Sequence, residues 1–308
     1  MNQRVTLFAV GLALGLPLNA AERQASIGVP PWQGAEAKTA VVAEILEILG
    51  YDVSLTSAAA PLVFQELAQG RLDFNLSAWK PGQDGAFGPY VDDGDIVILG
   101  ENLTGAETGL AVPASLREAG IRSLEDLAEH GERFDHTIYC IEPGSGAEAV
   151  AGEAIESDLY GLGDWTLLPS STEGMLVEVG RAIERDRAIV FCGWAPHWMN
   201  ISYDIHYLED PLAHWGEPGE TRVFTLARAG LEADDPDLAR FLSQFRVEAN
   251  VQSDWIHATA RDERPLEQMA RSWIRENLDQ VGTWLDGVRS VGGSEAFEVV
   301  SKEFQPQQ

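Results

Sequence analysis

Basic residues are scarce in this chain of 308 residues, which has 21 Lys and Arg against 49 Asp and Glu and a formal net charge of −28. Such a charge argues against nucleic acid and against anionic lipid as partners, because both repel an acidic protein. The acids are spread along the expected helices rather than gathered in one tail. We therefore interpret the charge as a strongly solvated surface and not as a binding site.

The sequence also lacks the motifs of common catalytic and metal centres. No Gly-x-Ser-x-Gly elbow is followed by Asp and His in suitable contexts, and no metal-ligand cluster or nucleotide-binding loop is present. Gly144-Ser145-Gly146 is not a nucleophile elbow, because no pattern places a base beside it. We expect no catalytic residue, no cofactor and no metal. The alternative from another class of protein is a secreted α/β hydrolase.

Cysteine is nearly absent, since the chain has only Cys140 and Cys192. Both lie in strand-like apolar runs, Thr137–Ile141 and Ile189–Cys192. In an oxidising compartment they could form a disulfide if those strands are neighbours. Two buried free thiols fit the pattern equally well. Without a matching His spacing, the two Cys indicate no metal site.

No apolar run after residue 21 approaches the roughly 18–20 residues of a membrane span. Residues 1–21 have the features of a secretory signal peptide, with Arg4 in a positive n-region, a short apolar stretch from Val5 to Leu18, and small residues at Ala20 and Ala21. We expect cleavage near Ala20 or Ala21 and export of a soluble chain to the periplasm. No Cys lies near this position for lipid attachment.

Strand-like and helix-like segments alternate from residue 25 onward, which is the pattern of parallel sheets with crossover helices. Residues 89–94 are expected to form a loop, and residues 265–285 one long helix. The C-terminal part of the chain is mostly helical in pattern and leaves no third sheet. We predict an α/β fold of two lobes. Lobe I comprises residues 22–105 and 228–308, and lobe II, residues 106–227, is inserted into it.

Three tryptophans share one sequence context. Trp32, Trp79 and Trp194 each follow a predicted buried strand directly, in a loop that contains Gly or Pro. Because ligands of open α/β sheets bind outside the carboxyl ends of the strands, three such indoles from two facing lobes can converge on one cleft. Several indole faces bind quaternary ammonium by cation–π interactions of about 0.5–2 kcal/mol each when desolvated. The alternative is that they are ordinary core aromatics, the role that we assign to the other tryptophans, Trp215 included.

The segment Glu142-Pro143-Gly144-Ser145-Gly146 joins a predicted strand to a predicted helix. Backbone N–H groups and a Ser hydroxyl at such a helix start suit a carboxylate or another anion. The alternative is a plain turn in which Ser145 caps the helix. His197 follows a proline in the loop after Trp194, where it could donate to a carboxylate or bond its own loop.

These loops, taken together and in order, resemble those of the substrate-binding proteins of quaternary-amine ABC importers. The resemblance covers nearly the whole mature chain and rests on Trp32, Ala78–Pro81, Ile141–Gly146, Ser171–Leu176, Gly193–Met199 and Tyr203–Asp210. It implies the two-lobed periplasmic-binding-protein fold (type II-like), with a ligand cleft between hinge-closing lobes. It also implies that Trp32, Trp79 and Trp194 form a cage around a trimethylammonium group, and that a membrane permease is the partner of the protein. We expect a monomer.

The resemblance also bears on which ligand is bound. Choline-type members have an acidic residue where this chain has Gly34, a Tyr where it has Thr108, and an Asn where it has Ser145. The polar set that holds choline is therefore missing, which favours a zwitterion with a carboxylate, above all glycine betaine. Choline, carnitine and dimethylsulfoniopropionate remain alternatives. The predicted ligand-binding residues are Trp32, Trp79, Trp194, His197, Ser145, Gln33, Gly34 and Thr108.

Overall fold

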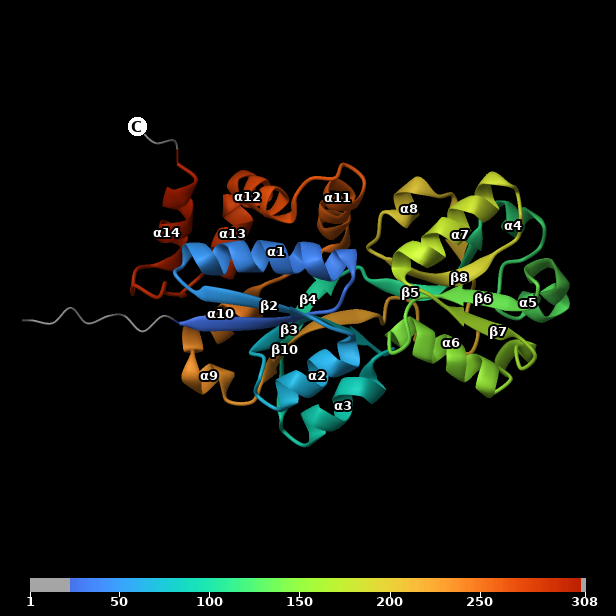
Figure 1. The fold of residues 1–308 in the computed structure, drawn as a ribbon, viewed down its shortest axis with the longest axis horizontal. Helices are drawn as coiled ribbons and strands as arrows, with labels where there is room; N and C mark the ends of the chain where they lie inside the picture. The colour runs from blue at the N-terminus through green and yellow to red at the C-terminus, as the bar shows by residue number, and fades with distance from the viewer. Residues whose placement is uncertain (1–22, 306–308) are drawn as a thin grey trace, which may run out of the picture.

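The structure, a computed structural model, describes residues 23–305, so the predicted signal peptide lies outside the described residues. Two lobes lie side by side, and helices cover both faces of the sheet in each lobe (Figure 1). The prediction of a two-lobed α/β fold is thereby confirmed. Within residues 23–305, no helix is both long enough and apolar enough to span a lipid bilayer.

The first lobe is built on a six-stranded sheet. Its strands are β1 (Gln24–Val29), β2 (Asp52–Ser57), β3 (Phe74–Lys80), β4 (Ile96–Thr104), β10 (Arg222–Arg228) and β11 (Val247–Glu248). Its helices are α1 (Gln33–Ile48), α2 (Ala60–Ala68), α3 (Asp84–Asp92), α9 (Leu231–Asp234), α10 (Pro236–Gln244), α11 (Ala249–Ala260), α12 (Leu266–Glu276), α13 (Leu278–Trp284) and α14 (Ala296–Glu303). The strand order is β11-β4-β10-β3-β1-β2, with β10 antiparallel to both of its neighbours. In Figure 1, α1, α11 and α12 lie above this sheet, and α2 and α3 lie below it.

The second lobe is built on a five-stranded sheet in the order β7-β6-β8-β5-β9. Its strands are β5 (Glu107–Pro113), β6 (Thr137–Cys140), β7 (Thr166–Pro169), β8 (Val190–Ala195) and β9 (Ile205–Tyr207). Its helices are α4 (Ser115–Glu118), α5 (Asp126–Glu129), α6 (Gly146–Glu156), α7 (Thr172–Glu184) and α8 (Met199–Ser202), with short 3₁₀ helices at Gly131–Phe134 and Leu159–Gly161. The parallel strands β7, β6 and β8 carry the crossover helices α6 and α7 on opposite faces (Figure 1).

The chain crosses between the lobes twice, from β4 to β5 and from β9 to β10. The sequence-based boundary placed residues up to 227 in the second lobe. The strand β10 instead pairs with β3 and β4 of the first sheet, so the return crossing precedes Arg222. The apolar pattern of this segment indicates a strand but does not show which sheet it joins.

Two other sequence-based assignments differ from the structure. Residues 89–94 were expected to form a loop, but α3 covers most of them, because the fully buried Phe87 packs edge-on against Phe64 at 5.4 Å between ring centroids. The long helix expected over residues 265–285 is split into α12 and α13 at Asn277, whose backbone is not helical. Asn277 donates through its side chain to the Trp273 carbonyl at 2.8 Å, which favours the break. The final helix, α14, was not anticipated.

Helix α11 joins the hydrophobic cores of the two lobes. Trp255 belongs to the core of the first lobe, whereas the next residue, Ile256, is packed with the core of the second. The Arg261 guanidinium at the end of α11 lies 4.9 Å from the centroid of the Trp198 ring in the second lobe. Helix α11 therefore contacts both lobes.

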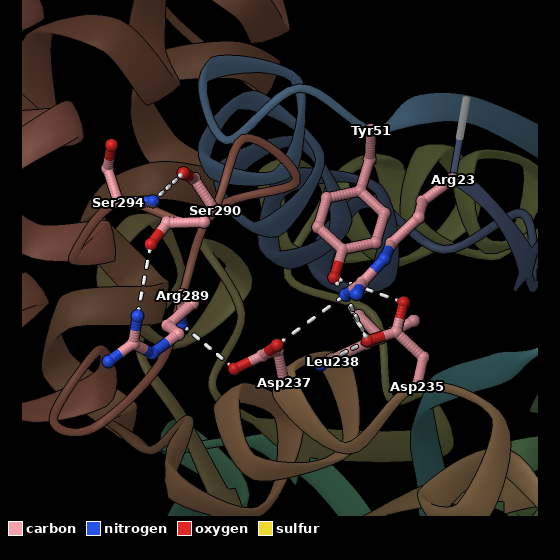
Figure 2. A network of polar contacts seen from close by, with 9 residues as sticks. Arg23, Tyr51, Asp235, Asp237, Leu238, Arg289, Ser290 and Ser294 are labelled. Atoms are coloured by element: carbon pink, nitrogen blue, oxygen red, sulfur yellow. Dashed lines mark hydrogen bonds and ion pairs between the residues drawn. The ribbon is translucent and has the colours of Figure 1, made fainter. Parts of the chain in front are cut away.

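A polar network fastens the start of β1 to α10 (Figure 2). Arg23 donates to Asp235 at 3.0 Å, and the Tyr51 hydroxyl lies 3.2 Å from both oxygens of the same carboxylate. Asp235 also caps α10 by accepting the Leu238 N–H at 3.1 Å. Figure 2 shows that Asp237 connects this cluster to Arg289, whose backbone N–H it accepts at 2.9 Å. The C-terminal helices are thereby tied to the sheet of the first lobe.

A disulfide joins Cys140 at the end of β6 to Cys192 in β8. The two strands are parallel, with Ile138 beside Val190 and Tyr139 beside Phe191, so the next pair in the register brings the two Cys together. Their Cα atoms lie 4.9 Å apart. Of the two possibilities that the sequence allowed, the structure has the disulfide.

Candidate functional site

A cavity lies between the two lobes at the N-terminal end of α1. It contains about 60 Å³ within which the centre of a water-sized molecule can move, several times the roughly 10–15 Å³ that one water needs. The cavity is lined by Trp32, Gly34, Ala35, Lys38, Ser77, Trp79, Lys80, Gly82, Gln83, Thr108, Ile141, Ser145, Gly146, Ala147, Val150, Trp194, Pro196, Trp215 and Gln252.

The three tryptophans singled out in the sequence all line this one cavity. Trp32 is the residue that precedes α1, whereas Trp79 and Trp194 lie within the last two residues of β3 and β8. The expectation that Trp79 and Trp194 follow their strands in loops was therefore wrong, because both strands continue past these residues. Pairing with β10 extends β3, and pairing with β5 extends β8, so that Val223 lies beside Trp79 and Thr108 beside Trp194.

A fourth tryptophan, Trp215, lines the same cavity, although we assigned it only a packing role from the sequence. It lies in the connection from β9 to β10, follows no strand directly, and is 5 % exposed. Its backbone N–H donates to Asp210 at 2.7 Å, and a Cβ atom on Gly216 would lie 3.1 Å from Pro81 of the first lobe. Within the described residues, its buried indole Nε1 has no hydrogen-bond acceptor. A donor is therefore free beside the cavity.

Several contacts hold the two lobes together around the cavity. The Trp32 indole donates to the Glu142 carboxylate of the second lobe, and the Trp198 indole donates to Gln33 Oε1 of the first at 2.9 Å. A Cβ atom on Gly146 would lie only 2.9 Å from the backbone of Gly82. This spacing means that the two backbones touch. Gln33, a predicted ligand residue, thus contacts the other lobe and is not among the lining residues.

His197 is also absent from the cavity lining. It is 1 % exposed, and its ring lies between Trp194 at 4.9 Å and Trp198 at 5.3 Å, measured between centroids. Burial lowers the pKa of His197 to about 3, so the imidazole is neutral near pH 7 and brings no positive charge to an anion. Its ring packs against that of Trp194.

The remaining predicted residues, Ser145, Gly34 and Thr108, do line the cavity. Ser145 caps α6 by accepting the Glu148 N–H at 3.2 Å, so the helix-cap interpretation of this residue is confirmed. A side chain at position 34 would require Gln252 to move, because a Cβ atom there would lie 2.7 Å from its amide nitrogen. The Gln252 side chain thus fills the space beside Gly34.

The ionisable groups of the cavity wall are both basic. Lys38 and Lys80 line it, and among the lining residues of the described chain none is Asp or Glu. Lys80 is partly exposed and pairs with Asp84 at 3.1 Å. Lys38 is only 1 % exposed, and its Nζ donates to Asn102 Oδ1 at 2.7 Å. Burial lowers the pKa of Lys38 to about 7.

We expect the stability of the ligand-free protein to depend on pH through Lys38. Between pH 7 and 10.5 the unfolded chain holds a proton on this amine that the folded protein does not, so stability rises with pH across this range. The full shift corresponds to on the order of 5 kcal/mol. Lys38→Met removes this cost. The gain in unfolding free energy of the variant over the parent, measured by urea titration, should be largest at pH 6 and shrink by pH 10. A gain that is the same at both pH values would contradict the prediction.

Comparison with known proteins identifies relatives of the whole two-lobed structure. Residues 24–276 match the model of the substrate-binding domain of ABC-type glycine betaine transport systems. The glycine betaine/carnitine transport binding protein GbuC of Listeria monocytogenes is 35 % identical over 167 residues. That alignment covers 54 % of this chain and 54 % of the relative, so the chain spans about half the length of that curated protein.

Solved structures extend the similarity across nearly the full chain. An ABC-transporter choline-binding protein in complex with choline superposes with a TM-score of 0.88 at 29 % identity, covering 92 % of this chain and 98 % of that one. Lactococcal OpuAC, closed on glycine betaine, gives a TM-score of 0.79 at 30 % identity and covers 85 % and 99 % of the two chains. The similarity confirms the predicted periplasmic-binding-protein fold.

Proposed function

The chain belongs to the family of substrate-binding domains of ABC-type glycine betaine transport systems, and from this premise we propose that it captures a zwitterionic methylated onium compound, above all glycine betaine, and delivers it to an ABC permease. Members of this family bind transport substrates and are not enzymes, which sets aside the hydrolase alternative. We propose further that the protein is exported to the periplasm and works as a monomer.

The observation that carries this proposal is the wall of indoles. Trp32, Trp79, Trp194 and Trp215 come from four separate segments of two lobes and line one cavity. A methylated ammonium has no N–H to donate, so the faces of indole rings satisfy both its charge and its apolar surface. We assign the cage to Trp32, Trp79 and Trp194, with Trp215 as a fourth wall.

The charge of the wall favours a zwitterion over a cation. A ligand such as choline carries a net positive charge, and the lining residues offer it two lysines and no carboxylate. A ligand with its own carboxylate meets donors instead, among them Ser145 and the unpartnered Gln83 Nε2 within the described structure. Glycine betaine and carnitine, which the curated relative is named for, both have this chemistry. The choline complex among the solved relatives keeps choline as the alternative.

Capture is proposed to occur by closure of the lobes. Trp32 and Trp79 belong to the first lobe and Trp194 to the second, so a ligand that contacts all three favours the closed form. We assign three contacts between the lobes to that form. They are the Trp32–Glu142 and Trp198–Gln33 hydrogen bonds and the contact of Gly82 with Gly146. The closed protein would then be the species that the permease recognises, and ATP hydrolysis elsewhere in the importer would drive transport.

Titration calorimetry of the refolded, ligand-stripped protein tests the proposal with matched ligands. We expect saturable binding of glycine betaine, with carnitine, dimethylsulfoniopropionate and choline compared beside it. The control is 3,3-dimethylbutyrate, which has the shape and carboxylate of glycine betaine but carbon in place of the charged nitrogen. It should bind at least about 30-fold more weakly, because it lacks the cation–π attraction of several rings. Failure of every onium compound to bind would overturn the proposed function.

A further inference from the structure

Lys38 occupies an unusual position for a lysine. It lies one turn beyond Gly34 and Ala35 on α1, and all three line the cavity. The N-terminal end of α1 points toward the second lobe (Figure 1). Side chains of a helix lean toward its N-terminus, so the long Lys38 side chain leans toward the cleft and not away from it.

The ammonium of Lys38 has a neutral partner and no countercharge. Its Nζ donates to Asn102 Oδ1, and in the described part of the chain no carboxylate lies within ion-pair distance of it. Asn102 is itself fixed, because its amide donates to the Leu76 carbonyl at 3.0 Å and to the Thr225 hydroxyl at 2.9 Å. Only one of the three N–H groups of the ammonium is satisfied in this way.

Another buried ionisable residue of the first lobe, in contrast, has a partner of opposite charge. Glu44, on the same helix, is 6 % exposed and pairs with Arg271 of α12. A buried charge without such a partner is costly, and an anion that enters the cavity can supply one. The other unpartnered donors of the wall, the Gln83 amide and the Trp215 indole, are neutral and cannot distinguish a zwitterion from a cation by charge.

We propose that Lys38 binds the carboxylate of the ligand and thereby makes the site select zwitterionic over cationic onium compounds. This inference rests on the proposed function. The cage of indoles recognises the methylated onium group that both kinds of ligand share. Lys38 recognises the group that only the zwitterion has, with Asn102 as a positioning residue. A ligand such as choline, which lacks a carboxylate, leaves the buried ammonium uncompensated and adds a second positive charge near it.

The test is the ratio of two dissociation constants, for choline and for glycine betaine, measured by calorimetry at pH 6.5. We expect the parent to prefer glycine betaine by about 100-fold or more. In Lys38→Met, glycine betaine should bind at least about 30-fold more weakly, because a charge-assisted hydrogen bond is lost. Choline should bind equally well or better, so the ratio should fall to within about fivefold of unity. Lys38→Gln keeps a donor without the charge and should also lose most of the preference.

Lys302→Met is the matched control, because it removes one positive charge from the exposed surface of α14. It should leave the ratio unchanged. A ratio that stays at the parental value in Lys38→Met or, should that variant not fold, in Lys38→Gln would overturn the inference while the proposed function stands. A parent protein that binds no onium compound would overturn both.

Discussion

Trp194→Ala is expected to weaken the binding of glycine betaine by roughly 30–150-fold, which corresponds to about 2–3 kcal/mol. Trp194 is the tryptophan that the second lobe's sheet contributes to the cavity wall, from the end of β8. On the proposed function, its removal deletes a cation–π face and a ligand contact that favours the closed form. Calorimetry on the folded variant measures the loss.

Trp165→Ala is the control that separates affinity from folding. Trp165 is also a buried tryptophan of the second lobe, but it packs against Phe134 at 5.9 Å and His136 at 5.6 Å between centroids, away from the cavity lining. We expect this variant to be destabilised by roughly 3–5 kcal/mol while its folded fraction binds with the parental dissociation constant. Equal affinity losses in both variants would mean that Trp194 acts through the fold and not as part of the cage.

The sequence was sufficient to predict that Trp32, Trp79 and Trp194 lie at one cleft. Their context at strand ends follows from chain topology, because the carboxyl ends of parallel strands meet at one edge of a sheet. Two such sheets that face each other across a cleft then make one site. The role of Ser145 as a helix cap could also be predicted from the sequence. Its hydroxyl accepts the N–H of Glu148, three residues later, and such a cap depends only on the local sequence.

The residues that the sequence did not indicate depend on long-range packing. Trp215 reaches the cavity because Asp210 and the nearby Pro81 fix the connection in which it lies, and no periodic pattern marks that segment. Lys38 sits in an ordinary helical pattern, where a lysine is typically solvated. Its burial follows from packing against a distant strand, where its partner Asn102 lies 64 positions further along the chain. His197 was expected at the ligand, and its burial between two indoles could not be read from its place after a proline.

Removal of the disulfide is expected to lower the stability of the protein substantially. The bridge between Cys140 and Cys192 closes a loop with a sequence separation of 52 residues. The loop-closure entropy that it removes from the unfolded chain corresponds to about 4 kcal/mol. The double variant Cys140→Ala, Cys192→Ala should therefore unfold at lower urea concentration, and its melting temperature should fall by roughly 10 °C. The parent protein with its disulfide reduced should show the same change.

Ligand affinity is expected to respond much less than stability to this change. Cys140 directly precedes the segment that carries Ser145, and Cys192 lies two residues before Trp194, so the bridge joins two strands that hold the site. Those strands are also joined by their own parallel pairing, which persists without the bridge. We expect the dissociation constant for glycine betaine to stay within about threefold of the parent below the melting transition. A larger loss of affinity with little loss of stability would contradict this expectation and mean that the bridge maintains the native geometry of the site. A loss of stability with nearly unchanged affinity would mean that the bridge acts mainly on the unfolded chain.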